Sequence, residues 1–199
     1  MKLVVATKNA HKIHELSEML AIDGLTLVSL ADVGFTGEIE ENGSTFAENA
    51  LIKARAAAKF CGLPALADDS GLCVDALDGA PGIYSARYAS ADGENASDAA
   101  NVEKLLEKLK GIPSGERTAR FVCAIALVLP DGTEKTVTGA CEGVITSEVR
   151  GNGGFGYDPV FYYVPYCKTF GEATEDEKNV VSHRANAVRL IKQQLLELR

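Results

Sequence analysis

The first thirty residues alternate an apolar run, an amphipathic stretch and a second apolar run, and this order constrains the fold more than any other feature. Residues 3–6 and 25–30 are apolar and are predicted to be strands. Residues 9–20 are predicted to be a helix, because Ile13, Leu16 and Leu20 share its apolar face. A strand–helix–strand unit usually pairs its strands in parallel through a right-handed crossover. The chain therefore begins as an α/β protein.

A long helix is predicted to follow the polar, acidic loop of residues 32–44. Thr45 and Glu48 form a capping-box pattern, in which the threonine oxygen accepts from the third helical amide and the glutamate reaches back. The alanine-rich run that follows has high helix propensity up to Phe60, and Gly62 is a typical terminator. The acidic loop therefore leads directly into the N-terminus of a helix.

The middle of the chain predicts further strands. Residues 64–67 and 72–77 are short apolar segments on either side of a polar turn, residues 68–71. Residues 119–129 and 135–145 flank a Pro-Asp-Gly-Thr sequence, which is a strong hairpin signal. The parallel start and this antiparallel hairpin together predict one mixed sheet.

The remaining segments complete the predicted architecture. Residues 97–109 form an amphipathic helix, residues 151–158 a glycine-rich loop, and Ser182 is expected to cap a last helix that runs to the C-terminus. No internal repeat or interdomain linker interrupts the chain. We therefore expect a single domain over residues 1–199, with a mixed sheet flanked by helices.

Composition narrows the classes of function. The formal net charge of -8 argues against non-specific binding to nucleic acid, which relies on a basic surface. The five cysteines are odd in number and contain no C-x-x-C pair, as expected of reduced thiols rather than of a disulfide framework or a zinc site. No apolar run has the length of a membrane span or a signal-peptide core. We expect a cytoplasmic protein that binds a small molecule.

The junction of the first strand and helix is a candidate phosphate site. Residues 7–12 read Thr-Lys-Asn-Ala-His-Lys, and a helix N-terminus offers amides and a positive dipole end to an anion. Lys12 lies about one turn beyond Asn9, so both can face one ligand. The ordinary alternative is a capped helix followed by a solvated lysine.

Acidic residues form a candidate metal site. Carboxylates are hard oxygen ligands that suit Mg²⁺, and the chain has the pairs Glu40-Glu41 and Asp68-Asp69. Asp69 follows an apolar strand, where α/β proteins often place catalytic side chains. A solvated acidic loop and an Asx-type turn are the alternative. Lys53 lies four residues after Asn49 on the long helix, so these two side chains share one face.

The glycine-rich loop is a candidate site for binding a base. Glycines are interleaved with Phe155 and Tyr157 in residues 151–158, and such aromatics can stack on a base where glycines let the backbone approach closely. Lys178 and the Ser-His-Arg sequence of residues 182–184 add donors. A flexible connector and a helix cap with exposed cations are the alternatives.

Taken in order, these segments resemble the inosine/xanthosine triphosphate pyrophosphatase family. The resemblance covers nearly the whole chain and rests on residues 7–12, 40–50, 67–72, 79–88, 153–159 and 182–184. One position departs from the pattern, because Lys8 stands where many family members have glycine. His11 occupies a variable position of the opening motif.

The resemblance implies hydrolysis of inosine, deoxyinosine and xanthosine triphosphates (ITP, dITP and XTP) to the monophosphate and pyrophosphate, which keeps deaminated purines out of DNA and RNA. It implies a Mg²⁺ cofactor held by Glu40 and Asp69, with Glu41 as a close rival of Glu40, and Asp69 as the proton acceptor. It implies a homodimer with an elongated mixed sheet in two lobes and a cleft between them. The implied substrate contacts are Thr7, Lys8, Asn9, Ala10, His11, Lys12, Lys53, Ser70, Phe155, Gly156, Tyr157, Asp158, Lys178, His183 and Arg184.

Arg184, or backbone amides near it, would donate to the 6-carbonyl of the base and leave the amino group of adenine unpaired. Three other functions remain open at this point. They are a pyrophosphatase for other modified nucleotides, a nucleotide-binding regulator without turnover, and a phosphatase with an aspartyl nucleophile. The last lacks the usual Asp-x-Asp spacing at Asp68-Asp69.

Overall fold

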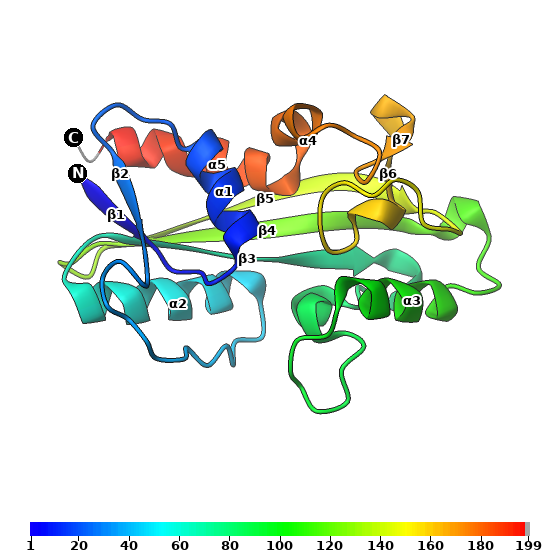
Figure 1. Ribbon diagram of the computed structural model, residues 1–199, viewed down its shortest axis with the longest axis horizontal. Helices are drawn as coiled ribbons and strands as arrows, with labels where there is room; N and C mark the ends of the chain where they lie inside the picture. The colour runs from blue at the N-terminus through cyan, green and yellow to red at the C-terminus, as the bar shows by residue number, and fades with distance from the viewer. Residues whose placement is uncertain (198–199) are drawn as a thin grey trace. The chain divides into compact units, whose positions relative to one another are not determined.

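The computed structural model describes residues 1–197 and contains a seven-stranded sheet with helices around it (Figure 1). The strands are β1 (Lys2–Val5), β2 (Thr26–Ser29), β3 (Ala65–Val74), β4 (Thr118–Val128), β5 (Glu134–Ile145), β6 (Phe161–Tyr163) and β7 (Lys168–Thr169). The helices are α1 (Ala10–Met19), α2 (Phe46–Cys61), α3 (Asp98–Lys108), α4 (Glu175–Val181) and α5 (His183–Leu196). Short 3₁₀ turns cover Asp75–Leu77, Gly82–Arg87, Ser114–Glu116, Asp158–Val160 and Val164–Tyr166.

The sheet is mixed, as predicted. Its strand order is β2-β1-β3-β4-β5-β6-β7. β1 pairs in parallel with both β2 and β3, whereas β6 pairs antiparallel with β5 and β7. The predicted strand–helix–strand opening and the predicted long helix are both present, the latter capped by Thr45 and ended by Gly62 in the left-handed conformation at φ 65°. The fold class from the sequence is therefore confirmed.

The chain divides into two compact units. The first comprises Met1–Asp69, Cys123–Gly139 and the segment that starts at Arg184, and the second comprises Ser70–Val122 and Ala140–His183. Strands β3, β4 and β5 each contribute residues to both units. A single catalytic domain over residues 1–199 stays a prediction.

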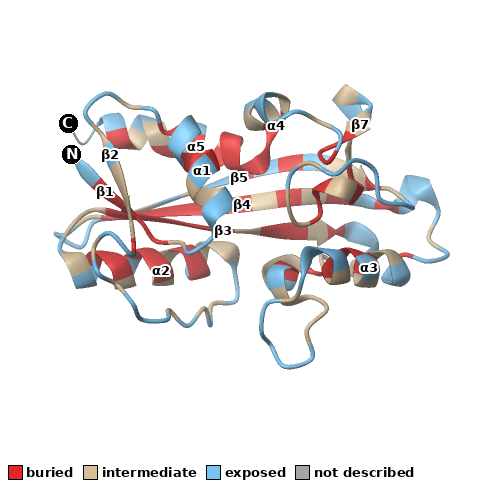
Figure 2. Ribbon diagram, viewed as in Figure 1, coloured by how far each residue is buried: buried red, intermediate tan, exposed pale blue. Residues whose placement is uncertain are grey.

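In the first unit, helices cover both faces of the sheet (Figure 1). One core joins α1 and α5 to the sheet through residues such as Leu3, Leu16 and Ile191. The other core joins α2 to the opposite face, where Val4 packs with the alanines of that helix, Ala54 among them. Successive residues of a strand point to opposite faces, so β1 feeds the two cores alternately. Figure 2 shows the resulting buried centre of the sheet.

The second unit has its own core, which is rich in aromatic rings. Val102 and Leu105 of α3 pack in it with Phe121 of β4. The ring of Phe121 lies 4.5 Å from that of Phe161 and 4.8 Å from that of His183, measured between centroids. These ring contacts join β4 to β6 and to the first residue of α5.

The predicted turn at residues 68–71 is wrong. Residues 65–74 form one continuous strand, so Asp68 and Asp69 lie inside β3 rather than after it. The pairing of β1 with β3 ends at Val5 and Leu66. Both aspartates therefore still lie beyond the carboxyl end of β1, although they do not end a strand of their own.

Three elements were not predicted, namely β6, β7 and α4. Helix α4 carries a full capping box, in which Thr174 accepts from the amide of Glu177 and the Glu177 carboxylate accepts from the amide of Thr174. That signal was available in the sequence. At α2 the expected box is altered, because Glu48 accepts from the amide and hydroxyl of Ser44 at 2.6 and 2.7 Å.

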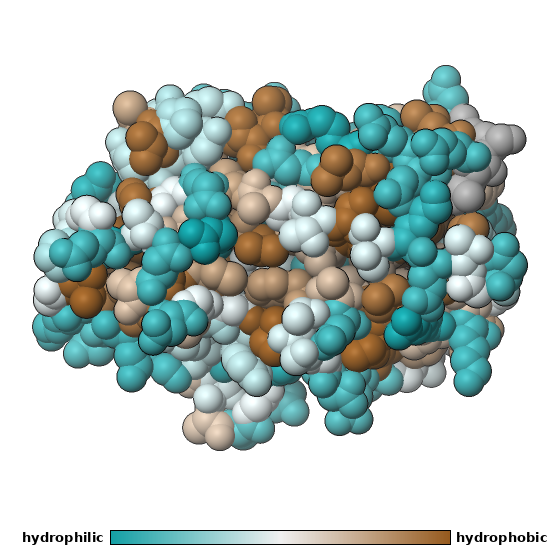
Figure 3. Space-filling model, turned by 180° about the vertical axis from the view of Figure 1, so that it is seen from behind, coloured by the Kyte–Doolittle hydropathy of each residue, from teal (hydrophilic) through white to brown (hydrophobic). Residues whose placement is uncertain are grey.

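The surface carries isolated apolar side chains. Phe60, Tyr84, Val149, Val180 and Leu190 are exposed and come from different elements. On the face drawn in Figure 3, hydrophobic side chains are interspersed with polar ones. None of the helices within residues 1–197 combines the length and the apolar character that a bilayer crossing requires.

Candidate active site

Two neighbouring aspartates form the centre of the site in the first unit, and β3 points them to opposite faces of the sheet. Asp68 has the parity of Leu66, which packs with α1 and α5. Asp69 has the parity of Ala67, which packs with α2. The alternation of a strand therefore gives two identical side chains different surroundings.

Asp68 is fully buried among cations from α1 and α5. Its Oδ2 lies 3.1 Å from Lys12 Nζ and 3.0 Å from Arg184 Nη2. The thiol of Cys123 also lies 3.9 Å from this oxygen. Burial raises the pKa of Asp68, but the positive charges of Lys12 and Arg184 outweigh it and hold the pKa well below its usual range. Asp68 is therefore a fixed negative charge.

Asp69 faces α2 and keeps 12% of its side chain exposed. Lys53 Nζ lies 3.2 Å from Asp69 Oδ1, and Asn49 donates to Oδ2 at 3.2 Å. Burial raises the pKa of Asp69, and the charges of Lys53 and Lys12 offset this only in part, so the pKa stays above its ordinary value. A carboxylate with a raised pKa and access to solvent is suited to accept a proton.

The acidic loop joins this site through Glu41. Its carboxylate lies 2.8 Å from Lys53 Nζ, so one ammonium contacts both Glu41 and Asp69. Glu40, in contrast, is exposed. Burial lowers the pKa of Lys53, but Asp69, Asp68 and Glu41 outweigh it and raise the pKa. Two carboxylates that converge on one cation form a donor set that suits Mg²⁺.

The start of α1 is an N-cap, as in the ordinary alternative. Asn9 Oδ1 accepts from the amide of Lys12 at 3.2 Å, and Thr7 Oγ1 accepts from the amide of Asn9 at 3.2 Å. Lys8, Ala10 and His11 are exposed there. The solvated lysine of that alternative is wrong for Lys12, because its ammonium is paired with a buried carboxylate.

The side chain of Arg184 is fully buried in the first unit. It is 0% exposed, and its guanidinium contacts Asp68 through Nη2 and Glu15 through Nη1. The expected donation to the 6-carbonyl of a base stays a prediction. In this arrangement the direct effect of Arg184 is to hold Asp68.

The second unit organises the glycine-rich loop around a buried ion pair. Asp158 Oδ2 lies 2.7 Å from Lys178 Nζ and accepts from the amide of Phe155 at 2.9 Å. Lys178 Nζ lies 4.5 Å from the centroid of the Phe155 ring. Gly154 adopts φ 71°, and a Cβ there would lie 2.1 Å from the Asp158 carboxylate. The pair therefore fixes the backbone that carries Phe155.

The other predicted residues of this unit have different surroundings. Tyr157 is buried and donates its hydroxyl to the carbonyl of Ser85 at 2.8 Å, and His183 stacks on a core ring. Gly156 donates its amide to Asp98 at 2.6 Å, and Ser70 is half-buried in β3. Of the two aromatics proposed for stacking, Phe155 is the one that is not buried in the core.

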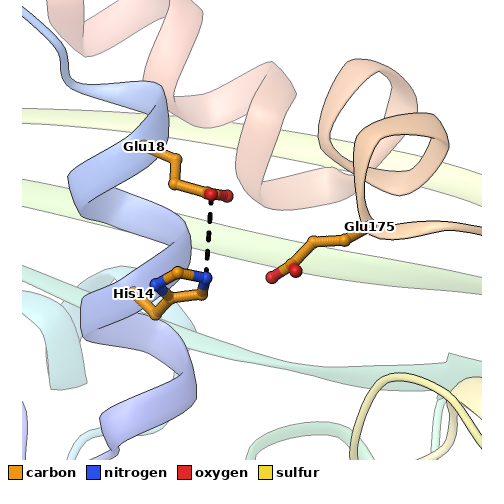
Figure 4. Close-up of side chains that lie close together, drawn as sticks. All are labelled: His14, Glu18 and Glu175. Carbon is orange, nitrogen blue, oxygen red and sulfur yellow. Dashed lines mark ion pairs between the residues drawn. The ribbon is translucent and has the colours of Figure 1, made fainter.

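One surface group resembles a metal site by residue type. Figure 4 shows His14 and Glu18 on α1, with His14 Nε2 3.7 Å from Glu18 Oε1, and Glu175 on α4. All three are exposed, and Glu175 belongs to the other unit. Exposed pairs one turn apart are common on helices. We therefore assign this group no role.

The comparison with known proteins now places the chain. The model of the Ham1 family matches residues 3–194. The chain belongs to the Ham1 family. A dITP/XTP pyrophosphatase of Desulforamulus reducens is 55% identical over 190 residues, covering 95% of this chain and 92% of that protein.

Two further matches extend over nearly the full length of this Ham1 family member. A dITP/XTP pyrophosphatase of Bacillus subtilis is 52% identical, covering 94% of this chain and 92% of that protein. The solved structure of the Staphylococcus aureus Ham1 protein superposes with a TM-score of 0.89 at 40% identity and covers 100% of both chains. The mixed sheet described above is thus the fold of its family.

Sequence reasoning did not name Glu15, and it placed Asn49 on one face of α2 with Lys53 without giving Asn49 a role. Glu15 contacts Arg184, and Asn49 contacts Asp69. The signal for Asn49 was present, because it precedes Lys53 by four residues and is a polar residue on the buried side of α2. For Glu15 the only signal was a charged residue next to the apolar Leu16.

Proposed function

We propose that this chain hydrolyses the non-standard purine nucleoside triphosphates ITP, dITP and XTP to the monophosphate and pyrophosphate. The observation that carries the proposal is Asp69, a partly accessible carboxylate with a raised pKa beside Lys53 and Glu41. The names of the relatives at 55% and 52% identity support the choice of substrate and reaction.

The proposed step is the attack of water on the α-phosphorus, with pyrophosphate as the leaving group. Asp69 orients the water and accepts its proton, because its raised pKa favours the protonated state that forms. Lys53 and Lys12 supply positive charge near the phosphates, where positioning and charge neutralisation do most of the catalytic work. Asp68 holds Lys12 in place.

Glu41 and Asp69 are proposed to hold Mg²⁺. This revises the sequence expectation of Glu40, because Glu41 is the glutamate that shares Lys53 with Asp69. When bound, Mg²⁺ neutralises phosphate charge and lowers the pKa of a coordinated water.

We further propose that Phe155 stacks on the base. The other residues proposed to contact the substrate, as the family resemblance implies, are Thr7, Lys8, Asn9, Ala10, His11, Lys12, Lys53, Ser70, Gly156, Tyr157, Asp158, Lys178, His183 and Arg184. The chain is proposed to act in the cytoplasm as a homodimer that clears deaminated purines from the nucleotide pool. Sedimentation at micromolar concentration tests the dimer, which a single monomeric species would contradict.

A substrate panel tests the activity. ITP, dITP, XTP, GTP, ATP and methylated nucleotides are incubated with and without Mg²⁺, and pyrophosphate and monophosphate are both measured. We expect equimolar products from the first three substrates, far slower turnover of ATP and GTP, and loss of activity without the metal. Preference for a methylated nucleotide supports the rival pyrophosphatase. Binding without turnover supports a regulator, and either result contradicts the proposal.

A further inference from the structure

Asn49 connects the Asp69 carboxylate with the acidic loop, residues 32–44, in the first unit. It is the fourth residue of α2 and is 2% exposed. Its Nδ2 donates to Asp69 Oδ2 at 3.2 Å, and its Oδ1 accepts from the amide of Gly43 at 2.8 Å. We infer that Asn49 is a positioning residue that fixes the Asp69 carboxylate and the acidic loop at the same time. The catalytic part of this inference rests on the proposed function.

The orientation of the Asn49 amide follows from its partners. The backbone amide of Gly43 can only donate, so the oxygen of Asn49 must face it. The NH₂ group then faces Asp69, where an ionised carboxylate is the matching acceptor. Position 49 therefore requires a side chain that accepts from the Gly43 amide and donates to Asp69. A flipped amide group would lose both hydrogen bonds.

Gly43 supplies an independent observation. A Cβ at this position would lie 2.7 Å from Asn49 Oδ1 and 2.7 Å from the Cβ of Glu48. Real side chains do not tolerate such contacts, so the loop reaches Asn49 only because residue 43 is glycine. Gly43 lies two residues after Glu41, and its anchoring therefore limits where the Glu41 carboxylate can lie.

Asn49 and Lys53 work as a pair on one face of α2. Lys53 contacts Oδ1 of Asp69 and Asn49 contacts Oδ2, so both oxygens of the carboxylate are held. Two fixed points set the plane of a carboxylate, whereas one leaves it free to rotate. Misplacing a catalytic group by about 1 Å can cost about 10²-fold in rate.

Two substitutions separate the two contacts. Asn49→Asp keeps an oxygen for the Gly43 amide but replaces the donor toward Asp69 by a second carboxylate. Asn49→Ala removes both contacts. The matched control is Asn101→Ala: Asn101 is also the fourth residue of a helix, is 2% exposed, and bridges two backbone groups, the amide of Ala89 at 2.8 Å and the carbonyl of Ala86 at 3.1 Å.

The experiment measures kcat and KM on ITP for the full chain, and amide hydrogen exchange at Gly43 in metal-free protein without nucleotide. Both Asn49 variants are expected to lower kcat by about 10- to 100-fold with KM changed less. Asn101→Ala is expected to keep kcat within a few-fold of wild type. Exchange at Gly43 is expected to stay slow in Asn49→Asp and to become fast in Asn49→Ala.

Wild-type kcat in either Asn49 variant overturns the inference, as does an equal loss in Asn101→Ala, since a general structural effect would explain it. Unchanged exchange at Gly43 in Asn49→Ala overturns the loop anchor. A wild-type protein that hydrolyses none of the triphosphates contradicts the proposed function instead, and the exchange data then decide the loop anchor alone. If Asn49→Ala does not fold, Asn49→Asp still decides the kcat result.

Discussion

Asp68 and Asp69 lie on opposite faces of β3, and their carboxyl groups have different burial, partners and pKa shifts. On the side of α1 and α5, Asp68 is fully buried and contacts Lys12 and Arg184, which hold its pKa low. On the side of α2, Asp69 is partly exposed, shares Lys53 with Glu41, and has a raised pKa. Position in the strand therefore gives two adjacent aspartates opposite pKa shifts.

The two aspartates differ in how far nearby cations offset the cost of burying their charge. Lys12 and Arg184 lie within 3.1 Å of Asp68 Oδ2 and hold this carboxyl ionised, which favours the folded state. The surroundings of Asp69 offset the cost of burying its charge only in part, which favours binding of a proton or a metal ion by the Asp69 carboxylate. We therefore propose that Asp68 contributes to stability and that Asp69, one position further, contributes to the chemistry.

The largest effect is expected for Asp69→Asn. We expect kcat to fall by about 10²–10⁴-fold, because the proton acceptor is lost, while nucleotide affinity stays within a few-fold. Steady-state kinetics on ITP and equilibrium binding of the nucleotide measure the two quantities. Near wild-type turnover would remove Asp69 from the catalytic role.

Asp68→Asn tests the other face. Removing this charge leaves the buried Arg184 and the half-buried Lys12 without their shared partner, and breaking a buried ion pair typically costs about 3–5 kcal/mol. The free energy of unfolding in urea, measured in metal-free buffer, is expected to fall by this amount. Asp69→Asn is the matched control and is expected to lose much less stability. Equal losses in both variants would contradict the comparison.

The pH dependence of unfolding sharpens the comparison further. The folded-state pKa of Asp68 lies below its unfolded value of about 3.9, so its stabilisation is present above that pH and is lost as the pH falls below it. The stability gap between wild type and Asp68→Asn should therefore narrow in acid. Asp69 has the opposite shift, so acidification relieves the cost of its charge. A gap for Asp68→Asn that is constant from pH 7 to pH 3 would disprove the assignment.

Phe155→Leu tests the second unit and should leave both faces of β3 intact. Loss of base stacking is expected to raise KM by a factor equivalent to about 1–3 kcal/mol, with kcat little changed. Phe60→Leu, a change at an exposed ring of α2, is the control for which wild-type kinetics are expected. A fall in kcat without a rise in KM would show that Phe155 does not act by stacking.

The sequence predicted most of the fold because its signals are local. Apolar periodicity located α1 and α3, the capping pattern and alanine-rich run located α2, and the Pro-Asp-Gly-Thr turn located the β4–β5 hairpin. The break predicted at residues 68–71 was wrong because Asp-Asp-Ser-Gly resembles a turn. Lys12, Lys53 and Arg184 satisfy those carboxylates inside a strand, and they come from segments far away in the sequence.

Contacts between residues far apart in the sequence also limited what could be predicted about the site. The residue types were visible in the sequence, but their partners were not, because Asn49 is 20 residues from Asp69 and Arg184 is 116 residues from Asp68. Local pattern could not show that Glu41 rather than Glu40 contacts Lys53. The opposite pKa shifts of Asp68 and Asp69 also depend on those distant charges.

The central claim is that water attacks the α-phosphorus of a non-standard purine triphosphate. Hydrolysis of ITP in ¹⁸O-labelled water, followed by mass spectrometry of both products, tests it most directly. We predict one labelled oxygen in inosine monophosphate and none in pyrophosphate. Label in pyrophosphate, or release of orthophosphate with inosine diphosphate, would contradict the account.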